Sequence, residues 1–358
     1  MNENTHCFFA ASNSYDGFVS YFSEIFSPEN YEKIYILKGG PGTGKSSFMK
    51  AIINAFKEKE VNYEAIYCSS DPKSLDGLIL EHSSKKIAIV DGTAPHSTDP
   101  TYPGAIEKIV NLGDFWNEKL LQSNTEKIKE LSARKKQFYQ NAYQYLSVAK
   151  SCSDIVFNSI KEATTLKNES ISDLFKNSEK DKGIISTKLY SAFCKDGFVD
   201  IPLPFTDKTK IIDVVGIYGS EYFFMQNVFN TAKEYGLDLT VSPSPLDRNK
   251  YDYIFLKNSD IIFRARNKVS CKNTRVVDTS KFINTKKLEN VRNKIETLYK
   301  EKEAMLWSAT DEFKKAYDTH IALEKIYTAA MNFKKNQKKI EKVCEEINFA
   351  LSLRETNA

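Results

Sequence analysis

The sequence predicts an α/β fold with a parallel sheet that is duplicated, each half carrying a long helical extension. A glycine-rich loop joins a β-rich run to a helical run, and residues recur along the chain at a fixed offset. Long stretches with apolar residues at helical spacing then follow each α/β unit. A chain of 358 residues fits two domains of common size, and 41% hydrophobic content is ordinary for a globular protein.

The glycine-rich loop lies between a predicted strand and a predicted helix. Residues 33–37 alternate and are β-rich, and residues 47–56 place apolar side chains at helical spacing. The loop between them, Gly39 to Ser46, reads GGPGTGKS and matches the pattern GxxxxGK[ST]. This context predicts a sheet of the P-loop NTPase type.

Each residue type in this loop has a role in binding phosphate. Glycines let the backbone amides converge on an anion, and the following helix points its positive end at the same place. Lys45 is expected to reach the β- and γ-phosphates, and Ser46 to bind Mg²⁺. The expected ligand is a nucleoside triphosphate, with ATP favoured by general prevalence. The expected binding residues are Gly39, Gly40, Pro41, Gly42, Thr43, Gly44, Lys45, Ser46 and Ser47.

An acidic partner for the magnesium ion is expected at the end of a neighbouring buried strand. Residues 86–90 form an apolar run that ends in Asp91, which we predict as a metal ligand and catalytic residue. The next position, where many ATPases carry a glutamate base, is Gly92. The sequence therefore supports nucleotide binding more strongly than it supports hydrolysis. Thr93 and His96 follow the strand end and either contact the γ-phosphate or a second substrate, or structure the loop.

A second acidic segment follows the predicted strand at residues 62–67. Asp71 is a candidate catalytic residue that could orient water or metal, or accept a proton from an acceptor hydroxyl. The alternative is that Asp71 and Pro72 start a turn that Asp76 caps, and this alternative is favoured for Asp76.

The chain repeats itself at an offset of 176, the difference between Gly216 and Gly40. Ten identical pairs fall within residues 36–80, against roughly three by chance at ordinary composition. Upstream, the tetrapeptide Asp-Gly-Phe-Val occurs at 16–19 and at 196–199. The sequence therefore predicts a first P-loop domain at 1–182 and a second, degenerate P-loop-like domain at 183–358.

The second loop has lost the phosphate chemistry of the first. Glu221 stands where the first half has Lys45, and Tyr222 stands where it has Ser46. We therefore expect nucleotide in the first half alone. Arg264 and Arg266 follow the apolar residues 261–263, so either could act as an arginine finger on the γ-phosphate; the alternative, which we favour, is a structural role.

Long amphipathic helices are predicted from about 117 to 150, from about 288 onward and near 340–350. Their apolar stripes either pack in the core or between paired antiparallel helices, or they bind a protein partner. Lysines and acids interleave along most of the chain, so no clear nucleic-acid footprint emerges. No apolar run reaches the roughly 20 residues of a membrane span, and no signal peptide is recognised, so cytoplasm is the expected location.

Three motifs together resemble a bacterial family of tandem P-loop ATPases whose members are labelled ATPase or nucleotide kinase. The motifs are GGPGTGKSS at 39–47, CSSDPKSLDG at 68–77 and VDGTAPHSTDPTYPGA at 90–105. The resemblance covers nearly the whole chain and implies that Asp91, Thr93 and His96 belong to the site. We expect Mg-dependent ATP hydrolysis coupled to a conformational change. The alternatives are a kinase for a small molecule or nucleotide, and a non-catalytic ATP sensor.

Overall fold

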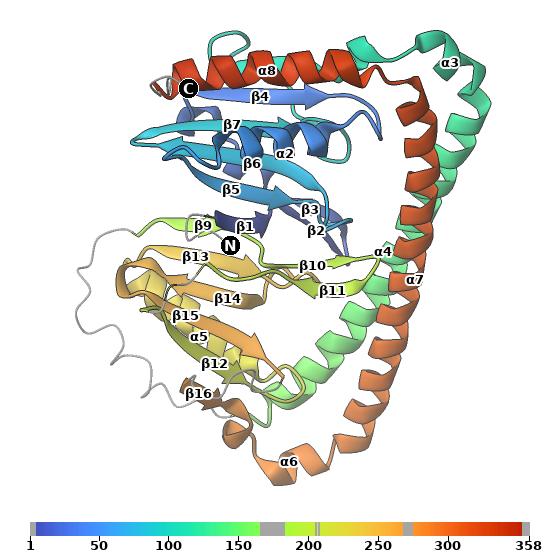
Figure 1. Ribbon diagram of the computed structural model, residues 1–358. Coiled ribbons are helices and arrows are strands. Elements are labelled where there is room, and N and C mark those ends of the chain that lie inside the picture. Colours follow the sequence, from blue (N-terminus) through green and yellow to red (C-terminus); the bar gives the residue numbers. More distant parts are fainter. Residues whose placement is uncertain (1–4, 165–182, 205, 207, 268–274, 353–358) are drawn as a thin grey trace. The chain divides into compact units, whose positions relative to one another are not determined.

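The computed structural model describes residues 5–164, 183–204, 206, 208–267 and 275–352, which fall into two units (Figure 1). The first unit takes residues 1–11, 18–140 and 312–358, and the second takes residues 12–17 and 141–311. Each unit is built on one six-stranded sheet.

The first sheet is mixed, with five parallel strands and one antiparallel strand. Its order is β1-β5-β6-β7-β4-β8, and β6 runs antiparallel to both of its neighbours. The connection from β5 to β6 is too short for the crossover that a parallel pair needs. The predicted all-parallel sheet is therefore wrong at β6. The strands are β1 (Thr5–Phe9), β4 (Lys33–Lys38), β5 (Asn62–Tyr67), β6 (Leu75–His82), β7 (Lys85–Asp91) and β8 (Glu107–Asn111).

The second sheet repeats the first in strand order and direction. Its order is β9-β13-β14-β15-β12-β16, with β14 antiparallel to both of its neighbours. The offset of 176 read from the sequence places β6 on β14, so the two halves are similar. The strands are β9 (Ile185–Thr187), β12 (Lys210–Val215), β13 (Leu239–Pro243), β14 (Tyr251–Leu256), β15 (Ile261–Arg266) and β16 (Arg275–Asp278).

Two short hairpins explain the repeated Asp-Gly-Phe-Val segment. Gly17 and Gly197 have φ of 110° and 82°, a left-handed conformation that favours glycine at a tight turn. Each glycine begins the second strand of its hairpin. The hairpins are β2 (Ala11–Ser14) with β3 (Gly17–Ser20), and β10 (Ser191–Cys194) with β11 (Gly197–Asp200).

Helices follow both glycine loops, and longer helices follow both sheets. The loop helices are α2 (Lys45–Phe56) and α5 (Glu221–Glu234), and the long helices are α4 (Thr125–Lys161), α7 (Arg292–Ala330) and α8 (Phe333–Ala350). The short helices are α1 (Phe22–Ile25), α3 (Glu118–Ser123) and α6 (Thr285–Glu289), with 3₁₀ turns at 28–30, 112–115, 257–259 and 279–282. In the part of the chain that the structure describes, none of these helices is long and apolar enough to cross a bilayer.

The core of the first unit joins segments from both ends of the chain. Apolar residues of β4 and β7 on one face of the sheet pack against α2 and α8. The α8 contribution comes from Ile340, Val343 and Ile347, which are at most 7% exposed. The opposite face is buried as well, including Ile34 and Ile36, which explains the continuous apolar runs in the sequence.

The units do not divide the chain at residue 182. The C-terminal end of α4 belongs to the second unit, where Val156 and Ile160 pack with Leu288 and Ile295. Residues 312–358, predicted as the extension of the second half, belong to the first unit. Each apolar stripe stabilises the sheet that it covers, whatever its position in the sequence.

Candidate functional site

The loop between β4 and α2 has the backbone shape that an anion site needs. Gly42 and Gly44 have φ of 71° and 87°, where a side chain would be strained, and Gly44 is the N-cap of α2. Thr43 Oγ1 donates to the Gly40 carbonyl at 2.8 Å and closes the turn. The α2 cap has no side-chain hydrogen bond, which leaves the positive end of the helix open to an anion.

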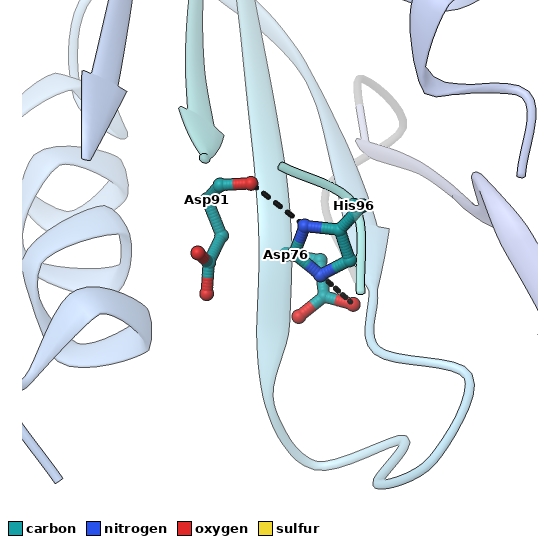
Figure 2. Close-up of side chains that lie close together, drawn as sticks. All are labelled: Asp76, Asp91 and His96. Carbon is teal, nitrogen blue, oxygen red and sulfur yellow. Dashed lines mark hydrogen bonds and ion pairs between the residues drawn. The ribbon is translucent and has the colours of Figure 1, made fainter. Parts of the chain in front are cut away.

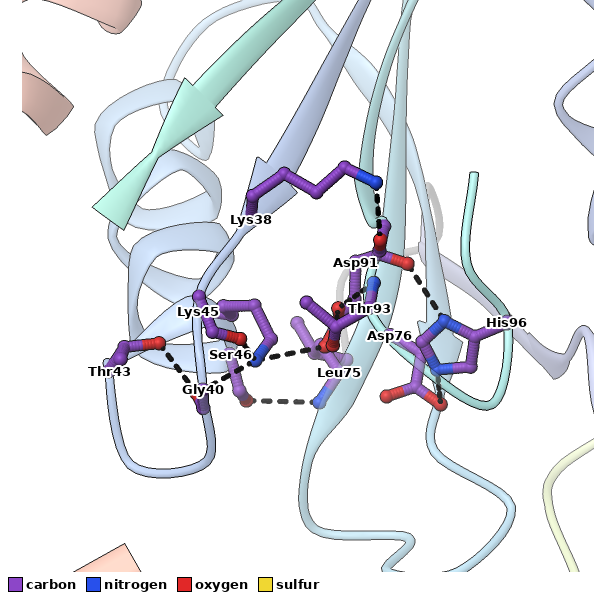
Figure 3. A network of polar contacts seen from close by, with 12 residues as sticks. Lys38, Gly40, Thr43, Lys45, Ser46, Leu75, Asp76, Asp91, Thr93 and His96 are labelled. Carbon is purple, nitrogen blue, oxygen red and sulfur yellow. Dashed lines mark hydrogen bonds and ion pairs between the residues drawn. The ribbon is translucent and has the colours of Figure 1, made fainter. Parts of the chain in front are cut away.

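Lys45 points its amine back into this loop (Figure 3). Its Nζ donates to the carbonyls of Gly39 and Gly40 at 2.9 and 3.1 Å and lies 3.6 Å from Asp91 Oδ2. Both side chains are 12% exposed. The loop and the end of β7 therefore bring the predicted lysine and aspartate together.

Asp91 is the last residue of β7, and Thr93 orients its carboxylate. The Thr93 amide and hydroxyl donate to Asp91 Oδ1 at 2.9 and 2.6 Å, which leaves Oδ2 on the side of Lys45. Burial raises the pKa of Asp91, while the charges of Lys45 and His96 oppose that shift. A cation beside this carboxylate would favour its charged form.

The Ser46 hydroxyl lies at the start of β6, where its Oγ accepts a hydrogen bond from the Leu75 amide at 3.0 Å. Leu75 is followed directly by Asp76 in the strand. The first turn of α2 is thereby tied to the strand that carries a further buried carboxylate.

His96 joins Asp91 to Asp76 (Figure 2). His96 Nδ1 lies 2.8 Å from the Asp91 carbonyl oxygen, and Nε2 lies 3.5 Å from Asp76 Oδ2. The ring stacks on Phe22 with 4.4 Å between centroids. Burial lowers the pKa of His96, but the hydrogen bond and charge of Asp76 and the charge of Asp91 outweigh it, so the net pKa is raised. A raised pKa favours the charged ring, which cannot accept a further proton as a general base.

Asp76 is the site residue that sequence reasoning missed. It is buried within β6, so the turn-cap interpretation is wrong. Because β6 runs antiparallel, its first residues lie at the edge where β7 ends. Ligand atoms of Asp76, Asp91 and His96 all lie within 4.8 Å of one another. The available signal was the acid at the start of an apolar strand, repeated as Asp252.

Asp71 does not join this group among the contacts of the described residues. Its carbonyl accepts from the Ser74 amide at 2.9 Å, and its side chain lies 3.5 Å from the Lys73 amide. The turn interpretation of Asp71 is confirmed, and Asp71 is not among the residues grouped with Asp91, where it could orient water or metal.

Gly92 has a steric reason to be glycine. A Cβ at this position would lie 2.3 Å from Ile36 Cγ2 in the buried face of β4. The glutamate that many ATPases carry after the strand aspartate would require the buried Ile36 side chain to shift.

The corresponding region of the second unit has different chemistry. Glu221, at the position of Lys45, is buried, and its Oε2 has no hydrogen-bond partner among the described residues. Tyr222, at the position of Ser46, donates its hydroxyl to Asp252 at 2.9 Å. Burial raises the pKa of Glu221 to about 7 and that of Asp252 to about 6. This loop presents an acid where a phosphate needs a cation.

The arginines of the second unit are structural. Arg264 lies inside β15, and its Nε donates to the buried Asp213 at 2.7 Å. Arg266 donates to the Tyr253 hydroxyl at 2.8 Å and lies 5.0 Å from the centre of that ring. The arginine-finger alternative is therefore wrong for Arg264, whose guanidinium is committed to its own sheet.

Comparison with models of protein families, with curated proteins and with solved structures found no match.

Proposed function

We propose that the first unit binds a nucleoside triphosphate with Mg²⁺ in the loop 39–46 and hydrolyses it. The observation that supports this best is the position of Lys45, whose amine lies between the loop carbonyls and the Asp91 carboxylate. A triphosphate entering the loop would exchange those carbonyl contacts for contacts in which both Lys45 and its partner are charged.

The residues beside Lys45 fit magnesium. Ser46 and Asp91 offer a hydroxyl and a carboxylate, the hard oxygen donors that Mg²⁺ prefers. Thr93 holds the carboxylate in one orientation, as a metal ligand requires. When bound, the ion neutralises charge on the phosphate oxygens.

Asp76 is the carboxylate best placed to orient the attacking group. Gly92 carries no carboxylate, and the pKa of His96 is raised by Asp76 and Asp91, which favours the charged ring over a proton acceptor. Asp76 is buried, and its Oδ2 lies 3.5 Å from His96 Nε2. Carboxylate oxygens of Asp76 and Asp91 lie within 4.8 Å of each other. Acting on water it supports hydrolysis. Acting on the hydroxyl of a small molecule it supports a kinase, which is the second candidate function.

Contacts of the loop with the long helices support coupling to a conformational change. Thr328 at the end of α7 donates to the Gly42 carbonyl at 3.3 Å. A loop that tightens around phosphate would change this contact and so act on α7 directly. Nucleotide-dependent motion of α7 is part of the proposed function.

The proposal predicts that Lys45→Ala abolishes triphosphate turnover, because the variant lacks the cation between loop and phosphate. Phosphate release and total ADP from Mg-ATP are followed for the wild type and the variant. We expect a loss of about 100-fold or more. Lys50→Ala is the matched control, since that amine lies further along α2 and donates to the Lys73 carbonyl.

Each other outcome has a defined meaning. Full ATP affinity and activity in Lys45→Ala would overturn the proposal. ADP formation that requires an added hydroxyl acceptor would select the kinase. Tight Mg-ATP binding by the wild type without turnover would select the non-catalytic sensor.

A further inference from the structure

The segment that joins α7 to α8 lies directly on the glycine loop. We call residues 324–336 the elbow. A Cβ on Gly40 would lie 2.8 Å from Tyr327 Cε1, and one on Gly42 would lie 2.6 Å from the Glu324 carbonyl oxygen. Asn336 Nδ2 approaches the Thr43 carbonyl at 3.4 Å. Glycine is therefore needed at these positions for packing as well as for backbone shape.

The elbow lies on the side of the loop away from Asp91. In the sheet, β4 separates β7, which ends in Asp91, from β8. The elbow is tied to the segment that follows β8, where the Asn332 amide donates to the Phe115 carbonyl at 2.8 Å and Tyr327 contacts Trp116. If the terminal phosphates lie toward Lys45 and Asp91, the nucleoside end of the ligand extends toward the elbow.

Two side chains of the elbow, a buried carboxamide and an exposed aromatic ring, are suited to contact a ligand. Asn336 is 4% exposed, yet its Oδ1 has no hydrogen-bond partner among the described residues. A buried acceptor in this state carries a desolvation cost that a donor would relieve. Phe333, one turn earlier in α8, is 45% exposed and lies 3.5 Å from the Cβ position of Gly44. An exposed ring beside the loop is a surface on which a flat base can stack.

We propose that the elbow is the base-binding site, that Phe333 stacks on the base, and that Asn336 selects adenine. This inference rests on the proposed nucleotide binding. The Asn336 carboxamide offers its Oδ1 acceptor and, besides the N–H that approaches the Thr43 carbonyl, a second N–H donor, which match the 6-amino group and N7 of adenine. At the same edge guanine presents two acceptors, O6 and N7, so it would leave Asn336 Oδ1 unsatisfied. The site therefore favours ATP over GTP.

Calorimetric binding of Mg-ATP, Mg-GTP and inorganic tripolyphosphate tests the proposal. We expect the wild type to bind ATP at least about tenfold more tightly than GTP, and Asn336→Ala to bring the two within about threefold. Phe333→Ala should lose about tenfold in affinity for both nucleotides. Tripolyphosphate, which has no base, should bind both variants as it binds the wild type. Gln337→Ala is the matched control, because this neighbouring carboxamide is exposed and pairs with Glu341.

The outcomes separate the two proposals. Equal affinity of the wild type for ATP and GTP would overturn the base site, as would an unchanged preference in Asn336→Ala. Phe333 is exposed, so its variant tests the stacking surface without disturbing the core, and unchanged affinity there would also count against it. If neither tripolyphosphate nor either nucleotide binds the wild type, the proposed function itself is overturned.

Discussion

Lys45 and Glu221 occupy equivalent first positions of α2 and α5, and their opposite charges give the two loops opposite properties. The Lys45 amine is satisfied by the carbonyls of its own loop. The Glu221 carboxylate is buried close to Gly216, and one of its oxygens has no hydrogen-bond partner in the part of the chain that the structure describes. Under the proposed function, this charge difference favours phosphate in the first loop and disfavours it in the second.

Glu221 should make the protein less stable as the pH rises. Its pKa is near 4.5 in the unfolded chain and about 7 in the folded protein, so between these values the folded state holds a proton that the unfolded state has released. The free energy of unfolding then falls by about 1.4 kcal/mol per pH unit in this window, about 3 kcal/mol in all. Glu221→Gln should remove most of this fall and be the more stable protein at pH 8.

Urea unfolding of both proteins at pH 5 and pH 8 measures the effect. Asp252, with its pKa raised to about 6, leaves a residual pH dependence in the variant. Parallel pH profiles for the two proteins would contradict the prediction. Mg-ATP affinity serves as the control, since the variant leaves the first loop unchanged.

At the scale of elements, α8 has two roles in the first unit. Its first turns lie against the glycine loop, and its later turns fill the core beside α2. Glu346 adds a polar tie, because its carboxylate accepts from Lys108 of β8 at 2.6 Å and from the Tyr35 hydroxyl at 3.1 Å. The helix therefore links the sheet core to the proposed base site.

The packing role of α8 predicts a large effect at Ile347. This side chain is fully buried, so Ile347→Ala should lower the free energy of unfolding by about 2–5 kcal/mol through lost burial and a cavity. Phe349→Ala, two residues on and 88% exposed, is the control and should change stability by less than about 0.5 kcal/mol. Similar melting temperatures for the two variants would show that α8 does not pack as described.

At the scale of the whole molecule, the long helices α4 and α7 each contribute residues to both units, with the divisions at residues 140 and 312. Apolar residues of α8 pack against the sheet of the first unit, and one core cluster of the second unit includes the end of α4. The first half of the sequence therefore lacks part of its own core, whereas the described core cluster of the second sheet consists of residues of the second half alone.

A fragment of residues 1–182 should consequently fail to fold. It lacks Ile340, Val343 and Ile347, which cover the same face of the sheet as α2. The free energy lost by leaving this face uncovered by α8 exceeds the free energy of unfolding of a typical domain. Thermal unfolding followed by circular dichroism compares the fragment with the full chain. A cooperative transition in the fragment would show that the first half is an independent domain.

Local pattern was enough to predict the strand, loop and helix at 33–56, the buried strand ending in Asp91, and the similarity of the halves. Each of these features depends on residues close in sequence or on direct repetition. The sequence leaves both a catalytic and a structural role open for Asp71, Arg264 and Arg266, and the tertiary contacts distinguish between the two roles.

The short connection after β5 favours an antiparallel β6, but tertiary structure alone decided that Asp76 meets His96 beside Asp91 and that the elbow lies on the glycine loop. Asn336 and Gly44 are far apart in the sequence, and no periodicity in either segment records their contact. The amphipathic stripe of α8 determines that the helix must be covered, but any complementary apolar face satisfies that requirement. Which sheet it covers is decided by packing between distant segments.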